Sequence, residues 1–258
     1  MSSNKQAKIT LVGAGPGDVD LITYKGLKAL QTADVVLYDA LINPELLKEV
    51  PDGATLVYVG KRANQHAFQQ KEINEMLVAY AYQYGHVVRL KGGDAFVFGR
   101  GQEEMAHAKQ SGVPVEVVPG ISSCIAVPEL QHVPVTARSV SESFWVITGT
   151  TRSGQLSSDI ALAAQSTATV IILMGIRKLA EIRQLFIKEG RFNTPAMVVQ
   201  NGSREGEHKV VGTIDTILEQ VQDAQIGTPG IIVIGDVVRL HPEFVTQAIA
   251  EQTLQQAA

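Results

Sequence analysis

The sequence is poor in several features that would otherwise define its class of protein. Its 258 residues include one cysteine and one tryptophan, and aromatic residues make up only 5% of the chain. A single cysteine, Cys124, excludes a framework of internal disulfides and is consistent with a reducing cytoplasm. No segment approaches the roughly 20 apolar residues of a membrane-spanning helix. Residues 1–8 lack the apolar region of a signal peptide. We therefore expect a cytoplasmic protein that makes no use of a membrane.

The sequence also lacks an excess of positive charge. The formal net charge is -4, which argues against a general nucleic-acid-binding protein, and the few aromatic residues offer few surfaces on which bases could stack. The six histidines are scattered, and none has metal-ligand spacing to another histidine or to Cys124. The sequence therefore predicts no metal site, and any anionic ligand would need local clusters of Arg and Lys.

What the first half of the chain does contain is a regular alternation of short β-branched apolar runs with longer amphipathic stretches. The runs predict strands at 9–12, 35–38, 55–59, 87–90 and 115–118, and the stretches predict helices at 23–31, 71–84 and 102–110. Strands separated by helices of this length indicate a parallel sheet with helices on both faces.

This alternation begins again after Pro134. Strands are predicted at 144–148, 169–174, 196–200, 209–213 and 231–234, with helices near 160–165 and 179–189; the strand at 209–213 has the character of a hairpin strand. The predicted fold class is α/β, with two α/β domains that each hold a mostly parallel or mixed sheet flanked by helices. We place the domains at 1–135 and 143–241, followed by an Ala/Gln-rich, helix-prone tail at 242–258.

A glycine-rich loop, Gly13-Ala14-Gly15-Pro16-Gly17-Asp18, follows the first strand. In a dinucleotide-binding loop, glycines lead directly into a helix whose N-terminus holds the pyrophosphate. Here Asp18 places an anion at that position, Pro16 has no N–H to donate, and the helical pattern begins only near Thr23. The loop therefore disfavours a nucleotide cofactor, and taken alone it is as compatible with a tight turn as with a ligand site.

A second glycine-rich segment spans residues 90–101, with the sequence LKGGDAFVFGRG. It follows a buried parallel strand at the carboxyl edge of the sheet, where open α/β sheets bind ligands. Gly92 and Gly93 would let a ligand touch the main chain, and Asp94 could accept hydrogen bonds from hydroxyl or amine groups. An ordinary turn does not need so long a glycine-rich segment, so its length favours a functional interpretation.

Three shorter motifs have both a functional and a structural interpretation. Gly60-Lys61-Arg62, with His66 nearby, follows a strand, but adjacent cations are also common on solvated surfaces. Ser122 and Ser123 open a helix and could simply cap it. Met174 ends a strand in the second half, where a core position is the more common role.

Taken in order, these segments resemble the signature blocks of the uroporphyrinogen-III C-methyltransferases, a family within the S-adenosylmethionine-dependent tetrapyrrole methyltransferase superfamily. The resemblance runs from about Ile9 to Val238, and Gly60-Lys61-Arg62 and Phe98-Gly99-Arg100-Gly101 point to this family specifically. The matching blocks are 13–18, Tyr38-Asp39, 60–62 with His66, 92–104, 118–121, 134–138, Met174-Gly175, Gln200-Asn201-Gly202 and 230–235.

The resemblance implies transfer of methyl groups from S-adenosyl-L-methionine to two pyrrole carbons of uroporphyrinogen III, giving precorrin-2 for the sirohaem, cobalamin or haem d1 branch. It implies an active site in the cleft between the domains, a polyanionic tetrapyrrole as the partner, S-adenosyl-L-homocysteine as the second product and a homodimer. Because few residues precede Ile9, we expect a monofunctional enzyme.

The same resemblance assigns roles to individual residues. It places Asp39 and Lys61 at the proton-acceptor and proton-donor positions, with Arg100 as a rival for proton abstraction, tuned by Glu103. The residues implied in cofactor binding are Pro16, Gly92, Gly93, Asp94, Val97, Ser122, Ser123, Met174 and Gly202. Those implied in substrate binding are Arg62, Arg100, Glu103, Arg138 and Met174.

The chain departs from the family pattern on the expected substrate side. The family usually has Arg, Gly, His and His where this chain has Ala40, Asn64, Ala137 and Thr150. Two alternatives therefore stay open: a related methyltransferase that acts on a later corrinoid precursor or a diphthamide intermediate, and a non-catalytic α/β protein that binds a tetrapyrrole or a nucleotide.

Overall fold

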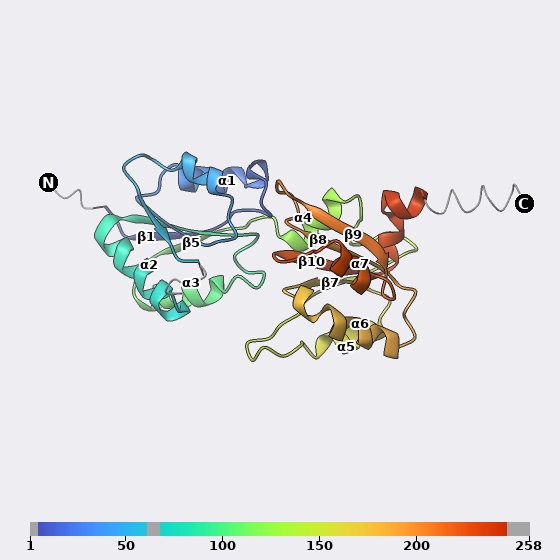
Figure 1. Cartoon of the computed structure of the whole chain (residues 1–258). Helices are drawn as coiled ribbons and strands as arrows, with labels where there is room; N and C mark the ends of the chain where they lie inside the picture. Colours follow the sequence, from blue (N-terminus) through green and yellow to red (C-terminus); the bar gives the residue numbers. More distant parts are fainter. Residues whose placement is uncertain (1–4, 61–67, 247–258) are drawn as a thin grey trace, which may run out of the picture. The chain divides into compact units, whose positions relative to one another are not determined.

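The computed structural model describes residues 5–60 and 68–246, which form two compact units. The units divide between Ser123 and Cys124 (Figure 1). The domain limits inferred from the sequence, 1–135 and 143–241, remain a prediction. Among the described residues, no helix is both long and apolar enough to cross a membrane.

The first unit is built on a five-stranded sheet in which every strand is parallel to its neighbours, as the alternating pattern predicts. The strand order is β3-β2-β4-β1-β5, so β1 lies between the fourth and fifth strands. The strands are β1 (Lys8–Gly13), β2 (Val35–Tyr38), β3 (Thr55–Tyr58), β4 (His86–Lys91) and β5 (Val115–Val118). The helices are α1 (Tyr24–Leu30), α2 (Gln70–Tyr84) and α3 (Gly101–Gln110).

Both faces of this sheet are buried. Alternate side chains of a strand point to opposite faces, so Val87 packs with α2 and α3 whereas Val88 packs with α1. Figure 1 shows α1 on one face of the sheet and α2 with α3 on the other. This arrangement leaves the carboxyl ends of five parallel strands at one edge of the unit, which is where the glycine-rich loops emerge.

Two short 3-10 helices in the first unit were not predicted. They are η1 (Val19–Leu21), which precedes α1, and η2 (Pro44–Glu49), which lies between β2 and β3. The side chains of Asp18 and Asn43 cap them by accepting hydrogen bonds from backbone N–H groups two residues ahead. Helices this short carry too few residues to produce a hydrophobic period, so the pattern of apolar residues did not reveal them.

The second unit holds a five-stranded mixed sheet. The strand order is β6-β7-β10-β8-β9; β6 and β7 are parallel and the other neighbours are antiparallel. The hairpin character predicted for 209–213 is confirmed, because β9 pairs with β8 in antiparallel register. The strands are β6 (Phe144–Thr148), β7 (Thr169–Leu173), β8 (Pro195–Gln200), β9 (His208–Thr213) and β10 (Gly230–Ile234).

Helices cover this sheet and its main hydrophobic core. Helix α5 (Asp159–Gln165), α6 (Leu179–Lys188) and α7 (Ile217–Asp223) pack on one face around fully buried residues such as Ile172 and Phe186. Helix α4 (Ser123–Leu130) and two 3-10 helices, η3 (Ile176–Lys178) and η4 (Asp236–Leu240), complete the elements. Residues 242–246 are helical, and the rest of the predicted tail lies outside the described residues.

Candidate functional site

Three glycines pack against one another at the carboxyl edge of the first sheet. They are Gly13 at the end of β1, Gly93 just after β4 and Gly120 just after β5. A Cβ atom added to Gly13 would lie 2.5 Å from the Gly120 nitrogen, and one added to Gly120 would lie 2.3 Å from the Gly93 oxygen. Gly15 and Gly93 also exchange backbone hydrogen bonds of 3.2 and 2.7 Å. Only residues without a side chain allow these loops to approach so closely.

Gly93 differs from Gly13 and Gly120, because the side on which its Cβ would point is open. Its φ is +67°, and an added Cβ would meet no heavy atom closer than the Ser123 nitrogen at 3.9 Å and the Ser122 Cα at 4.0 Å. The backbone of Gly93 therefore borders open space in front of the segment that begins helix α4. Gly93 uses its own N–H and carbonyl oxygen in the exchange with Gly15, so a ligand in this space would pack on its Cα and could bind main-chain groups of the neighbouring helix start.

Asp94 uses both carboxylate oxygens to hold this edge together. Its Oδ2 accepts a hydrogen bond from the Gly120 nitrogen at 3.0 Å, and its Oδ1 accepts one from the Phe96 nitrogen at 2.8 Å. The side chain thus ties the loop after β4 to the loop after β5. Each oxygen retains a second lone pair, so a ligand hydroxyl or amine could still bind.

The turn that carries Asp39 lies between two further glycines. A Cβ on Gly60 would lie 2.7 Å from the Ala40 nitrogen, and a Cβ on Gly92 would lie 2.6 Å from the Leu41 Cβ. Within the turn, Asp39 Oδ1 accepts a hydrogen bond from the Leu41 nitrogen at 3.0 Å. The ends of β3 and β4 therefore fix the position of this turn at the end of β2.

The turn around Arg100 has a strained backbone. Phe98 and Arg100 have φ values of 55° and 60°, in the left-handed region that residues with a side chain rarely adopt. The glycines on either side of Arg100 pack against the Ala95 oxygen, which would lie 2.6 Å from a Cβ on Gly99 and 2.7 Å from a Cβ on Gly101. Backbone strain of this kind is commonly maintained at functional sites.

Arg100 itself forms a two-pronged ion pair with Glu103. Its Nε and Nη2 each donate to a Glu103 oxygen at 2.7 Å, and both side chains are about half exposed. The hydrogen bond that Arg100 donates to Glu103 raises the pKa of the Arg100 guanidinium above its ordinary value. A raised pKa keeps the group protonated, which favours carboxylate binding over proton abstraction.

A group of buried charges lies beneath this edge, and the sequence interpretation missed it. Arg89 and Lys91, both on β4, are each 4% exposed, and Glu104 on α3 is 1% exposed. Arg89 Nε and Lys91 Nζ donate to the same Glu104 oxygen, at 3.1 and 2.9 Å. Burial, followed by the charge of Arg89, lowers the pKa of Lys91. Arg89 and Lys91 alternate with apolar residues in the second half of β4, and two cations in a strand that is buried on both faces were the signal that could have identified this group.

In the second unit, the predicted residues lie at the ends of strands. Met174 follows β7 with a φ of 57° and a side chain that is 51% exposed, so it is not a core residue. Its carbonyl oxygen accepts a hydrogen bond from Thr150 Oγ1 at 3.0 Å, so the threonine that replaces the usual histidine ties the loop after β6 to the loop after β7. Gly202 packs on α4, where its Cβ would lie 2.6 Å from Val127.

Other predicted residues lie in turns and loops where no contact among the described residues indicates a role, or lie outside the described residues. Arg138 is exposed in a turn closed by two hydrogen bonds between the backbones of Ala137 and Ser141. Pro16 and Val97 are half-buried in the loops after β1 and β4. Lys61, Arg62, Asn64 and His66 lie outside the described residues.

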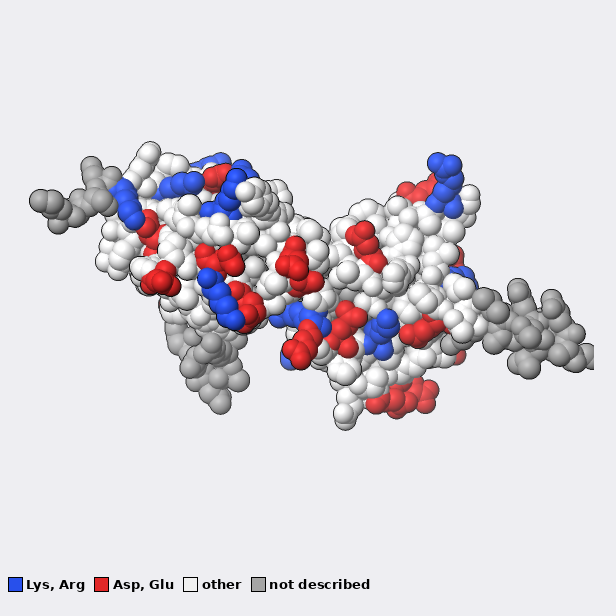
Figure 2. Space-filling model, turned by 90° about the horizontal axis from the view of Figure 1, so that it is seen from above, with Lys and Arg blue, Asp and Glu red and all other residues white. Residues whose placement is uncertain are grey.

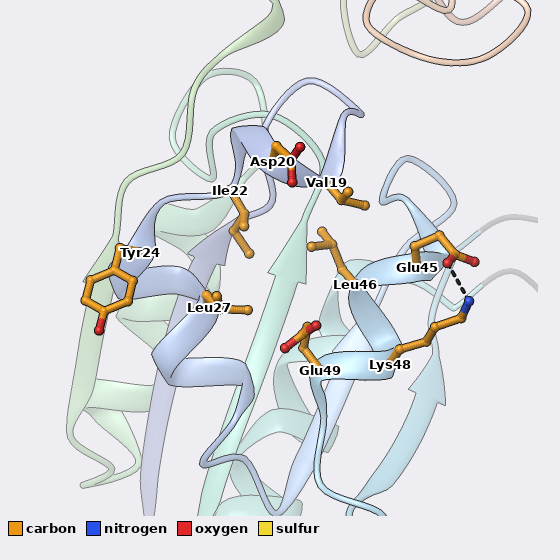
Figure 3. A pocket seen from close by; sticks show the side chains of 9 residues that line it. All are labelled: Val19, Asp20, Ile22, Tyr24, Leu27, Glu45, Leu46, Lys48 and Glu49. Carbon is orange, nitrogen blue, oxygen red and sulfur yellow. Dashed lines mark hydrogen bonds and ion pairs between the residues drawn. The ribbon is translucent and has the colours of Figure 1, made fainter.

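A cavity of about 430 Å³ lies away from these strand ends, between α1 with η1 and η2. Figure 3 shows the side chains of Val19, Ile22, Leu27 and Leu46 facing one another. Three carboxylates, Asp20, Glu45 and Glu49, also line it, and its lysine, Lys48, is paired with Glu45. An acidic lining would repel a ligand rich in carboxylates, so we do not assign this cavity to the candidate site.

Charged side chains of the described residues give no competing site on the face drawn in Figure 2. On the face drawn in Figure 2, basic and acidic side chains of the first unit are interspersed and form no broad basic patch. Within residues 5–60 and 68–246, no group of three or more His, Cys, Asp or Glu residues could hold a metal ion.

Helix α1 begins at Tyr24, six residues beyond the glycine-rich loop, after the intervening 3-10 helix η1. Asp18 is occupied as the cap of η1, and Thr23 caps α1 by accepting a hydrogen bond from the Gly26 nitrogen at 3.2 Å. The loop therefore lacks the direct entry into a helix on which dinucleotide binding depends, as the sequence indicated.

Comparison with known proteins assigns this arrangement to a family. Residues 8–218 match the family described as Tetrapyrrole (Corrin/Porphyrin) Methylases. The chain is 45% identical over 235 residues to a uroporphyrinogen-III C-methyltransferase from Methanocaldococcus jannaschii, covering 90% of this chain and 97% of that protein. It is 44% identical over 240 residues to siroheme synthase 1 from Cronobacter sakazakii, covering 93% of this chain but 50% of that protein, so it spans about half of that longer relative.

A solved structure shows the same fold. The uroporphyrin-III C-methyl transferase from Thermus thermophilus complexed with S-adenyl homocysteine is 35% identical, with a TM-score of 0.78, and the match covers 90% of this chain and 99% of that one. The family match covers residues 8–218, and the relative from M. jannaschii and the Thermus structure each match 90% of this chain. The chain belongs to the tetrapyrrole (corrin/porphyrin) methylases.

Proposed function

We propose that this chain is an S-adenosylmethionine-dependent uroporphyrinogen-III C-methyltransferase. The proposed reaction transfers methyl groups to two pyrrole carbons of uroporphyrinogen III and gives precorrin-2. The observation that carries the proposal is the open main chain of Gly93 on the three-glycine contact, at the sheet edge that also presents Asp39 and Arg100. The relative from M. jannaschii, which this chain matches over almost its full length, supports the choice of substrate.

The carboxyl edge of the first sheet fits a ligand with amine, hydroxyl and carboxylate groups. Gly93 borders open space on the side where a Cβ would point, Gly92 beside it packs against Leu41, and Asp94 offers carboxylate lone pairs. We assign binding of the methyl donor to these residues together with Pro16, Val97, Ser122, Ser123, Met174 and Gly202. When bound, S-adenosylmethionine supplies an electrophilic methyl group on a sulfonium.

The chain's residues then have three tasks in the proposed reaction. They orient an electron-rich pyrrole carbon in line with the S–CH3 bond, so that a C–C bond forms as that bond breaks. They manage the proton that the methylated, cationic ring must lose, and for this we assign Asp39 as the proton acceptor and Lys61 as the proton donor. They also bind substrate carboxylates, for which the planar fork of arginine is well suited.

We assign carboxylate binding to Arg62, Arg100 and Arg138, with Glu103 and Met174 also on the substrate side. Because Glu103 occupies the Arg100 fork in this structure, the substrate carboxylate must compete with Glu103 or bind to the remaining guanidinium donors. A homodimer in the cytoplasm that binds no nucleic acid is part of the same proposal.

The reaction is tested by incubating the chain with methyl-labelled S-adenosylmethionine and uroporphyrinogen III under anaerobic conditions. We expect two labelled methyl groups per tetrapyrrole and S-adenosylhomocysteine as the second product. A parallel reaction with EDTA should proceed at the same rate. Transfer to a later corrinoid precursor but not to uroporphyrinogen III would instead identify a related methyltransferase, and binding without transfer would identify a silent binding protein.

Replacing Gly93 with valine should weaken S-adenosylmethionine binding by well over tenfold, which corresponds to about 1.4 kcal/mol or more. The branched side chain would occupy the open space that borders the Gly93 main chain. Isothermal titration calorimetry on the folded variant measures the effect. Gly190→Val is a matched control, since Gly190 has a φ of +71° with no heavy atom within 4 Å of its Cβ position. Equal affinities for Gly93→Val and the wild type would contradict this placement of the ligand.

A further inference from the structure

The buried charges on β4 and α3 do not balance among themselves. Arg89 and Lys91 contribute two formal positive charges, whereas Glu104 contributes one negative charge. Buried charges are strongly unfavourable unless they are paired. The second carboxylate within reach is Asp39, whose side chain is 24% exposed and whose Oδ2 lies 3.4 Å from Arg89 Nη2. Asp39 therefore completes the charge balance of the group from its solvent-facing side.

Arg89 connects the buried group to Asp39 through a guanidinium that is held on every side. Its Nε donates to Glu104 Oε1 at 3.1 Å, and its Nη1 donates to the carbonyl oxygens of Leu90 at 3.0 Å and Leu37 at 3.4 Å. Contacts to β2, β4 and α3 leave Nη2 directed at Asp39. A guanidinium is planar, so fixing Nε and Nη1 also fixes the position of Nη2.

Asp39 is held at both oxygens as a result. Arg89 donates to Oδ2, and the Leu41 nitrogen donates to Oδ1 at 3.0 Å. The main chain of the same turn is confined by Gly60 against Ala40 and by Gly92 against Leu41. These contacts restrict both rotation of the carboxylate and movement of the turn beneath it.

We propose that Arg89 is a positioning residue that orients the Asp39 carboxylate for proton exchange with the methylated substrate, with Glu104 and Lys91 as its buried anchor. The inference rests on the proposed function, because it requires Asp39 to exchange a proton during methyl transfer. Arg89 is almost completely buried, so it acts through Asp39 without touching the substrate. A purely structural role for Arg89 would lower stability but would not alter how Asp39 works.

The test is a double-mutant cycle on the rate of methyl transfer to uroporphyrinogen III. Arg89→Lys keeps the charge but loses the planar fork, so kcat should fall between about tenfold and a hundredfold while the affinity for S-adenosylmethionine is unchanged. Asp39→Asn should lower kcat by about a hundredfold or more. In the Asp39→Asn background, adding Arg89→Lys should cause no further loss, since the group that it positions is already absent.

Two results would overturn the proposal: the same loss from Arg89→Lys in both backgrounds, or a folded Arg89→Lys variant with wild-type kcat. Arg183→Lys is a matched control, because Arg183 also donates to two backbone carbonyl oxygens and to an aspartate, Asp215, in the second unit. It should lower stability without changing kcat. Wild-type transfer is measured first, so an inactive wild type would reject the proposed function and not the positioning role alone.

A second variant decides the question if Arg89→Lys does not fold. Asp39→Glu retains the carboxylate on a partly exposed residue but moves it by one methylene, away from the geometry that Arg89 imposes. We expect it to lose nearly as much kcat as Asp39→Asn. Wild-type kcat in Asp39→Glu would show that the position of the carboxylate is unimportant and would reject the proposal.

Discussion

Replacing Arg100 with leucine should lower methyl transfer by at least about a hundredfold while leaving S-adenosylmethionine binding unchanged, because a misplaced substrate reacts far more slowly. Arg100 follows a strained turn at the carboxyl edge of the first sheet and stands at the start of α3 with a φ of 60°. In the proposed site its guanidinium binds a substrate carboxylate. Lysine should restore little activity, because it keeps the positive charge without the two-pronged geometry. Steady-state kinetics and calorimetry on the same preparations separate transfer from binding.

The competing explanation for Arg100 is an ordinary surface ion pair with Glu103, which would contribute only about 0 to 1 kcal/mol. Arg239 provides the matched control, because it forms an ion pair with Asp236 at the same sequence spacing and both side chains of that pair are similarly exposed. Arg239→Leu should leave the kinetics unchanged. Equal turnover by Arg100→Leu and Arg239→Leu would mean that Arg100 is a surface residue and no more.

Replacing Glu104 with glutamine should destabilise the chain by about 3 to 5 kcal/mol. Glutamine has nearly the same shape as glutamate, so the loss reflects the charge and not a cavity. It leaves Arg89 and Lys91 buried without their shared carboxylate. Urea unfolding measures the effect, and Glu103→Gln, the exposed neighbour on the same helix, should cost no more than about 1 kcal/mol.

The pH dependence of Glu104→Gln gives a further check on the cause. Burial already lowers the folded-state pKa of Lys91, and Glu104 opposes that effect. Without Glu104, folding should favour neutral Lys91 more strongly, so raising the pH toward the ordinary pKa of lysine should recover part of the lost stability. If the variant is as stable as the wild type at neutral pH, the buried group does not stabilise the fold through this carboxylate.

The sequence was informative about the fold wherever a local pattern determines the structure. The β-branched runs located strands such as β2 and β5 at their observed bounds, because a strand buried on both faces must be apolar throughout. The mixed pairing in the second unit was only partly visible, as a hairpin pattern near β9. The 3-10 helices η1 and η2 were missed because they are shorter than any hydrophobic period.

The candidate site was predicted less completely, for a different physical reason. Gly93 and Arg100 could be identified because both belong to one continuous glycine-rich segment that directly follows a strand. Arg89, Lys91 and Glu104 were passed over as members of a strand and a helix. Their connection depends on how α3 packs against β4, and that packing brings together residues 13 and 15 positions apart along the chain.

The contact among Gly13, Gly93 and Gly120 has a consequence for when this edge of the sheet comes into existence during synthesis. Its three members emerge from the ribosome far apart in time, and the last is supplied only after β5. A nascent chain that ends before β5 lacks the contact of Gly120 with Gly13 and the hydrogen bond that Gly120 donates to Asp94, so the loops after β1 and β4 are not yet held at this edge. A ligand can therefore bind at this edge only after the sheet is complete. Binding would then stabilise the folded unit, and it would not guide the folding of an incomplete one.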